Sequence, residues 1–177
     1  YPVQHAALKG HEAVVKLFLD KGYAPNEMSW DAYEPSALHS AVYGGHLDVT
    51  RLLLDHGADP SLKGAPSYPY QDLPAPLDVA LLKFGTILPW HRRKYSYTIR
   101  EGIPGAHEKC ALLLIERGAR LTTSDGASPY LVFAVQGNFM GVVQVLLTLG
   151  LDPNDDSCGQ TALGLANRHK YPELIEL

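Results

Sequence analysis

The sequence predicts an all-α fold, a solenoid of stacked helix pairs, from three features that recur along its 177 residues. The first is a pair of short amphipathic runs, clearest in 36–60, "SALHSAVYGGHLDVTRLLLDHGADP". The second is a glycine directly after each complete second run, and the third is a small alanine within each first run. Because one such pair cannot bury its apolar face alone, we expect the pairs to stack on one another.

The runs themselves have the pattern of helices buried on one face. Val49, Leu52 and Leu53 follow the i, i+3, i+4 spacing of an apolar helical stripe. Gly57 is expected to end that helix, since glycine adopts the left-handed cap conformation without side-chain cost. The other second runs end at Gly22, Gly118 and Gly150, and the alanines expected to let neighbouring repeats approach closely are Ala6, Ala41, Ala80, Ala134 and Ala166.

The same pattern divides the chain into repeats of one domain, 1–177. One copy is split, because its first run, 75–84, and its second run, 106–121, lie far apart. The predicted array therefore has about five repeats, the last one partial: 1–26, 27–60, 61–121 with an insertion at 85–105, 122–154 and 155–177. Since the first and last copies are incomplete, we expect either a piece of a longer array or atypical end repeats.

The motif in the second copy resembles the ankyrin repeat. Residues 36–41, "SALHSA", followed by Gly45-His46 and "GAD" at 57–59, are similar to the T-P-L-H-x-A signature and the flanking positions of that family. The resemblance implies a β-turn finger plus two helices in each unit and a non-catalytic role in protein–protein interaction. The other copies depart from the pattern, with the signature histidine replaced by Gln4, Asp78, Val132 and Gly164 and the finger aspartate by Arg120.

The third repeat is expanded twice. Its finger, 61–75, is long, because 20 positions separate Gly57 from Leu77 where the fourth and fifth repeats have 13. The insertion 85–105 lengthens the interval from the first helix to the capping glycine from 12 residues in the second repeat to 34. In the ankyrin architecture the finger and the inter-helix turn lie at opposite ends of the first helix. We therefore expect these two segments to flank one strip of the concave face and to give the module its specificity.

Aromatic and arginine side chains gather in these irregular segments, and such residues anchor protein interfaces because they bury area at low entropic cost. The alternative is that the aromatic residues pack on their own scaffold. Contact positions carried over from the family add finger residues and the pair that follows the signature alanine. The expected partner-binding residues are Trp30, Tyr33, Tyr43, Tyr68, Tyr70, Asp72, Lys83, Trp90, His91, Arg92, Arg93, Tyr95 and Gln136.

The basic stretch 90–95, "WHRRKY", has three interpretations. It could be a solvated loop, a site for an acidic or phosphorylated peptide, or a tract resembling a nuclear-localisation signal. The planar fork of arginine, which holds a carboxylate or phosphate through two bonds, fits the second interpretation. The expected partner is accordingly another protein or peptide, with an acidic or phosphorylated segment as one option.

Other functional classes find little support in the composition. A net charge of −4 disfavours nucleic-acid and anionic-membrane binding, and no apolar run approaches the roughly 20 residues of a membrane span. Two cysteines, Cys110 and Cys158, form no disulfide framework, which favours an intracellular location, cytoplasmic or nuclear. We expect no cofactor and no metal, because metal-ligand and nucleophile motifs are missing from the sequence.

One alternative function remains at this point, a small-molecule-binding or catalytic protein that uses a pocket between the two third-repeat segments. Its polar groups would be His91, Asp72 and Asp78, which could serve as a general acid or base. No activating partner can be identified for them, so a solvated histidine and a capping aspartate are the favoured roles.

Overall fold

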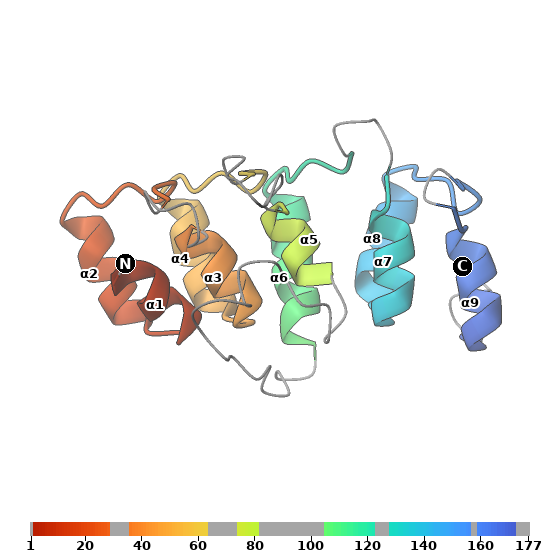
Figure 1. Cartoon of the computed structure of the whole chain (residues 1–177), viewed down its shortest axis with the longest axis horizontal. Helices are drawn as coiled ribbons and strands as arrows, with labels where there is room; N and C mark the ends of the chain where they lie inside the picture. The colour runs from red at the N-terminus through yellow and green to blue at the C-terminus, as the bar shows by residue number, and fades with distance from the viewer. Residues whose placement is uncertain are drawn as a thin grey trace, which may run out of the picture. The chain divides into compact units, whose positions relative to one another are not determined.

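The computed structural model describes residues 2–28, 36–63, 74–81, 105–122, 128–156 and 159–172, and all regular secondary structure in these ranges is helical (Figure 1). This confirms the predicted all-α fold. The chain divides into two compact units. The first holds α1 to α6 except for Leu81, the last residue of α5, and the second holds Leu81 and α7 to α9.

The first unit is built from helix pairs in which a first and a second helix alternate. α3 packs against α1, α4 packs against α2, and α6 packs against α3 and α4. In Figure 1, α3 and α5 lie in front of α4 and α6, so first and second helices form separate layers. The elements are α1 (Pro2–Leu8), α2 (Glu12–Asp20), α3 (Ala37–Tyr43), α4 (Leu47–Asp55), α5 (Pro76–Leu81) and α6 (Ala106–Glu116).

The second unit continues the alternation with α7 (Tyr130–Gly137), α8 (Met140–Thr148) and α9 (Ala162–His169). α7 packs against both α8 and α9. Thr161 caps the start of α9: its side chain accepts a hydrogen bond of 3.0 Å from the backbone N–H of Gly164 and so satisfies one free donor of the first turn. None of the described helices is long and apolar enough to span a bilayer.

The second helices end at the predicted glycines. At Gly57, which has φ of 87°, the backbone N–H of Ala58 bonds to Leu53 O and that of Gly57 to Leu54 O, both at 3.0 Å. These two bonds form the Schellman motif, which satisfies carbonyls that the helix leaves free. The same backbone conformation, with φ between 82° and 88°, occurs at Gly22, Gly118 and Gly150.

The first helices also turn through a left-handed residue, but only some of these residues are glycines. Gly10 and Gly45 have φ of 73° and 69°, whereas Asn138 and Lys170 take φ of 56° and 57° at the matching point after α7 and α9. A side chain in this region brings Cβ close to the following carbonyl and costs about 1–2 kcal/mol, less for asparagine. Lys170 is therefore the most strained of these turn residues.

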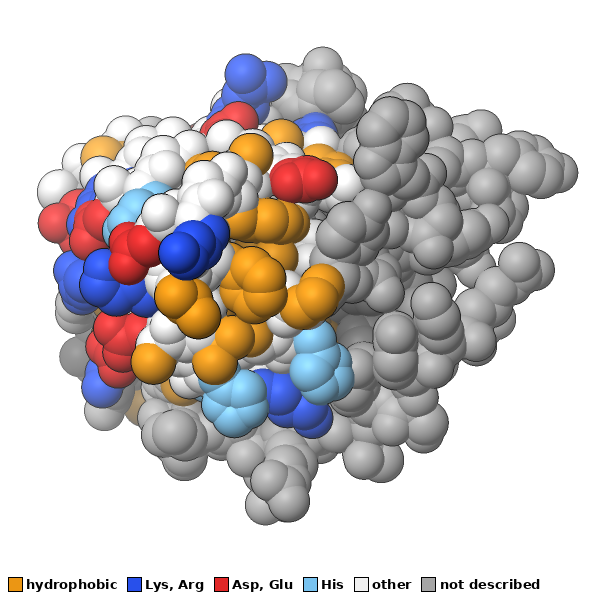
Figure 2. Space-filling model, turned by 90° about the vertical axis from the view of Figure 1, so that its left-hand side faces the viewer, with side chains coloured by type: hydrophobic (Ala, Val, Ile, Leu, Met, Phe, Trp, Pro, Cys, Tyr) orange, Lys and Arg blue, Asp and Glu red, His pale blue; other side chains and the backbone are white. Residues whose placement is uncertain are grey.

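Small and branched side chains fill the core, as the repeat pattern predicts. Each recurring alanine of the first helices is at most 5% exposed, and Val49 and Leu53 of α4 are 1% and 0% exposed. The large apolar side chains that stay exposed in the described residues include Val14 and Leu17 of α2. Figure 2, which faces the α1–α2 end of the first unit, shows hydrophobic side chains gathered on that surface.

Candidate interaction surface

The N-terminal end of α3 is held by a buried histidine. His39 Nδ1 lies 2.8 Å from Ser36 Oγ, and Nε2 lies 3.0 Å from the carbonyl oxygen of Pro74. Since a carbonyl can only accept, Nε2 carries the proton and donates it to Pro74, which leaves Nδ1 to accept from the Ser36 hydroxyl. The end of the long finger is thereby fixed to the start of α3.

Burial also sets the charge of this histidine. His39 is 0% exposed, and loss of water lowers its pKa to about 4, although backbone hydrogen bonds to Pro74 and Leu62 act in the opposite direction. The imidazole is consequently neutral at pH 7 and serves as a structural bridge between α3 and the finger.

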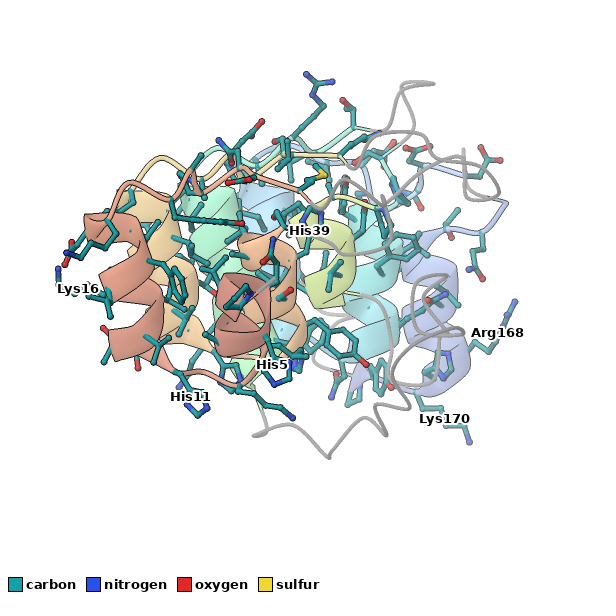
Figure 3. All side chains as sticks on the ribbon, turned by 60° about the vertical axis from the view of Figure 1, so that its left-hand side comes forward. His5, His11, Lys16, His39, Arg168 and Lys170 are labelled. Atoms are coloured by element: carbon teal, nitrogen blue, oxygen red, sulfur yellow. The ribbon has the colours of Figure 1, made fainter. Side chains whose placement is uncertain are left out.

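The opposite end of α3 is tied to α6 by a second histidine. His107 Nε2 donates to the carbonyl oxygen of Tyr43 at 3.0 Å, and His46 Nε2 makes the same bond to Leu8 O at 3.0 Å one repeat earlier. In Figure 3, His39 lies at the end of the first unit that carries the fingers, and His11 lies at the opposite end, where the two helices of each pair are joined. His46 and His107 therefore hold successive repeats together.

These two contacts position the expanded third repeat. Pro74 and Ala75 end the long finger before α5, and Gly105, with φ of 79°, directly precedes α6. The finger thus ends beside His39, near the first turn of α3. The insertion ends beside Tyr43, at the last turn of the same helix.

Neighbouring fingers are also linked through a side chain. Asn26 Nδ2 donates to Gly57 O at 3.1 Å, and its Oδ1 accepts from the backbone N–H of Asp59 at 2.8 Å. Asp59 in turn accepts a 2.8 Å bond from Ser61 N, which forms a local turn at the start of the next finger. The amide of Asn26 therefore fixes the first finger against the second.

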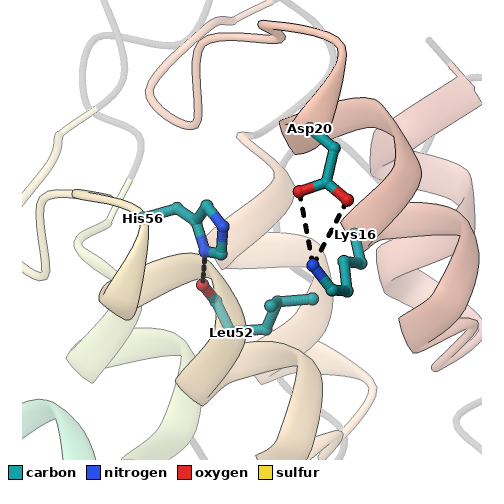
Figure 4. A network of polar contacts seen from close by, with 4 residues as sticks. All are labelled: Lys16, Asp20, Leu52 and His56. Carbon is teal, nitrogen blue, oxygen red and sulfur yellow. Dashed lines mark hydrogen bonds and ion pairs between the residues drawn. The ribbon is translucent and has the colours of Figure 1, made fainter.

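The second helices carry an ordinary solvated surface. Lys16 Nζ lies 3.2 Å from Asp20 Oδ2 within α2, and His56 Nδ1 donates to Leu52 O at 2.8 Å at the end of α4 (Figure 4). Arg117 and Asp55 pair at 2.7 Å between the ends of α6 and α4. Exposed pairs of this kind contribute little to stability, so this surface has no evident special chemistry.

The described residues offer little for catalysis. Asp78 Oδ2 accepts a 2.7 Å hydrogen bond from the backbone N–H of Ala75, so it caps the start of α5. His91 and Asp72, the other members of the possible acid–base group, lie outside the described residues. Within the described ranges no three histidine, cysteine or acidic side chains come together as a metal site.

Two of the expected partner-binding residues can be placed. Tyr43 is half-buried at the end of α3, where burial raises the pKa of its phenol and keeps it a neutral hydrogen-bonding group. Gln136 is half-buried near the end of α7, in the second unit. The remaining residues lie outside the described ranges: Trp30, Tyr33, Tyr68, Tyr70, Asp72, Lys83, Trp90, His91, Arg92, Arg93 and Tyr95.

Sequence reasoning did not identify two contacts that organise this surface. The bond from His39 to Pro74 spans 35 positions, and the link from Asn26 to Asp59 spans 33. The separation of about one repeat was the available signal, because a polar side chain in a stacked array meets the same part of the neighbouring repeat.

Comparison with known proteins agrees with the repeat pattern. A family model described as ankyrin repeats (3 copies) matches residues 1–64. An ankyrin repeat protein of fowlpox virus is 44% identical over 48 residues, which is 27% of this chain and 6% of the viral protein. Protein HOS4 of Saccharomyces cerevisiae is 46% identical over 52 residues, 29% of this chain and 5% of that protein.

A longer but weaker match extends beyond the first two repeats. The transient receptor potential channel pyrexia of Drosophila melanogaster is 25% identical over 138 residues, 78% of this chain. The chain spans only 12% of that channel and even less of the other two relatives. The matching repeats, the capping glycines and the buried His39 agree on one assignment. Residues 1–64 are ankyrin repeats, and the helix pairs that follow them repeat the same pattern.

Proposed function

We propose that the chain is a protein-interaction module that binds its partner on the first-helix, concave face of the first unit. Ankyrin repeats are in general protein–protein interaction modules and are not catalytic. In this chain, the long finger 61–75 and the insertion 85–105 are proposed to form two walls of the binding surface and to select the partner. Function in a repeat scaffold resides in such added segments, because the stacked helices are shared by the whole family.

The observation that carries the proposal is the attachment of both expansions to one helix. The hydrogen bond from His39 to Pro74 fixes the end of the finger at one end of α3, and that from His107 to Tyr43 fixes the end of the insertion at the other. His39 and Tyr43 are four residues apart on α3, so these two points are only about one helical turn apart. Two long segments that end so close to one helix favour a shared binding surface over two unrelated loops.

Tyr43 stands at this position with suitable chemistry. Its ring is half-buried and its phenol stays protonated, so it offers both apolar area and a polar tip. In the proposed site Tyr43 contacts the partner from the floor, while aromatic residues of the insertion contact it from the side. Arg92 and Arg93 are proposed to bind an acidic or phosphorylated group of the partner, which would make the affinity depend on salt.

The test compares capture of cellular proteins by the intact chain with capture by a chain lacking 85–105. We expect the deletion to lose the specific partner while its circular dichroism spectrum remains helical, because a shorter turn restores the ordinary repeat. Tyr43→Ala should weaken the same interaction, whereas Lys16→Ala, on the solvated outer surface, serves as the matched control. If the deletion and Tyr43→Ala retain the partner at unchanged affinity, the proposed site is wrong.

A further inference from the structure

The C-terminal end of α9, in the second unit, carries a cluster of exposed basic side chains. Arg168, His169 and Lys170 are consecutive and exposed, and these three residues form the basic cluster. In the part of the chain that the structure describes, neither Arg168 nor Lys170 makes a side-chain hydrogen bond or an ion pair. Figure 3 shows both of these side chains pointing outward from α9. Two permanent cations are therefore left without a described counter-charge.

The charges of the second unit are separated along α9. Its described acidic residues, Asp152, Asp155 and Asp156, lie in the finger that precedes α9, whereas the basic cluster lies at the other end of this helix. α9 has eight residues, so its two ends are about 12 Å apart, which exceeds the Debye length of about 8–10 Å at ordinary ionic strength. The acids of the finger therefore neutralise little of the basic cluster.

The helix beside α9 adds no opposing charge. α7 packs against α9, and residues 130–150, which hold α7 and α8, contain no charged side chain. Gln136 of α7 stands at the place in its repeat that Arg168 holds in the next, two residues after the recurring alanine. Equivalent residues of neighbouring repeats lie side by side in a stacked array. A half-buried amide thus borders the basic cluster and supplies neutral hydrogen-bonding groups.

The backbone at Lys170 matches that of the other first-helix turns, but the residue does not. The N–H of Tyr171 bonds to Ala166 O at 3.1 Å, and in the turns after α1, α3 and α7 the matching bond is 2.9 to 3.0 Å. The left-handed residue of those three turns is glycine twice and asparagine once. Either would make this turn with less strain than lysine, and a cation at an exposed helix end gains less from the helix dipole than this strain costs. The local fold therefore gives no reason for a lysine, and strained residues of this kind cluster at ligand-binding sites.

The two aromatic rings beside Lys170 contact each other. His169 and Tyr171 are stacked, with ring centroids 5.6 Å apart and 19° between the ring planes. At the position of Tyr171 the second and third repeats have His46 and His107, which bond to the preceding repeat. Tyr171 instead contacts a side chain of its own turn. The stack orients the imidazole between the two cations in the sequence, where its N–H group is available as a donor.

We propose that the basic cluster binds an acidic segment of a partner protein. Arg168 and Lys170 pair with its carboxylates, one through a planar fork and the other as a point charge, while Gln136 and His169 donate hydrogen bonds beside them. A nucleic acid or an anionic membrane fits less well, since either requires a larger basic surface than two permanent cations, and the net charge of the chain is −4. The inference concerns the second unit and does not depend on the site proposed in the first.

Fluorescence anisotropy of a labelled oligoglutamate peptide tests this proposal. The peptide is titrated at low salt with a whole chain that carries Arg92→Ala and Arg93→Ala, so that the arginines proposed for the first unit do not contribute. Lys170→Gly removes one charge and keeps the left-handed turn, and Arg168→Ala removes the other cation. Lys109→Ala, at an exposed position of α6, removes a cation elsewhere and serves as the matched control.

We expect Lys170→Gly and Arg168→Ala together to weaken binding by about tenfold or more, and added salt to do likewise, while Lys109→Ala changes the affinity by less than about twofold. Lys170→Gly alone should weaken binding although it raises the urea midpoint, and Lys170→Arg should restore the affinity. A lysine with a purely structural role would change the stability alone. No binding by the parent chain, equal affinity of the double variant, or an equal loss with Lys109→Ala would overturn the proposal.

Sedimentation of the natural chain distinguishes a second copy as the occupant, because the acidic finger of another copy offers the same carboxylate chemistry. We expect the chain to sediment as a monomer at low salt. A concentration-dependent oligomer that Lys170→Gly abolishes would show that a second copy occupies the basic cluster, and the proposal of a separate partner would then be wrong.

Discussion

Acid should weaken the first unit through His39. The pKa of this buried imidazole is lowered from its ordinary value of 6.5 to about 4 by loss of water, so the unfolded chain binds a proton more readily than the folded chain. The stabilising contribution is therefore complete above pH 6.5 and is lost as the pH falls from there towards 4. The sign follows because protonation of the exposed imidazole favours the unfolded state.

The size of the effect follows from this pKa difference. One pKa unit corresponds to about 1.4 kcal/mol, so the loss is about 2 kcal/mol between pH 7 and pH 5 and approaches about 3 kcal/mol near pH 4. Ordinary domains have only about 5–15 kcal/mol of unfolding free energy, so the change is large enough to measure.

Urea denaturation followed by circular dichroism at several pH values measures this contribution. The control is His39→Gln, since the first repeat holds Gln4 at the same position, where it is 4% exposed and donates to the Tyr23 hydroxyl at 2.9 Å. The variant will be less stable at pH 7, but its stability should fall less steeply below pH 6.5 than that of the natural chain. Equal slopes for the two proteins would refute the assignment of the proton uptake to His39.

Three other sets of substitutions examine the core, the turns and the insertion. Leu53→Ala, at a fully buried position, should lower the unfolding free energy by about 2–5 kcal/mol in urea denaturation, and a near-natural value would contradict the packing of α4. Lys170→Gly should raise the unfolding free energy by about 1 kcal/mol by relieving the left-handed strain, with a smaller gain for Asn138→Gly, and a loss on Lys170→Gly would argue against strain at that turn. Replacing Arg92 and Arg93 by Ala should weaken binding of an identified anionic partner more than tenfold in a titration, as should added salt, and unchanged affinity would reduce the pair to a solvated loop.

The sequence predicted the regular part of the fold well, because the determinants of that part are local. Gly57 could be recognised as a helix stop from its place after an apolar stripe, and its φ of 87° confirms the reason for choosing glycine. Ala41 could be recognised as a packing position from its recurrence, and it is fully buried. Such features need only a few neighbouring residues and the repeat period.

Features that depend on distant parts of the chain could not be predicted in the same way. The link between Asn26 and the second finger requires the exact stacking of two repeats, which no local pattern specifies. Lys170 breaks the glycine rule for its turn, so pattern matching alone did not reveal its conformation. The proposed walls of the binding site, 61–75 and 85–105, fall mostly outside the described residues and remain predictions.

The position of α3 and α4 in the first unit has a consequence for amide hydrogen exchange. These two helices contact α1 and α2 on one side and α6 on the other, whereas the described neighbours of α1 and α2 lie on one side. In a linear array an end pair can open while the rest stays folded, but an inner pair opens only with loss of two interfaces. Amides of α4 should therefore exchange through the opening of the whole unit, and those of α2 should exchange earlier, through fraying from the end.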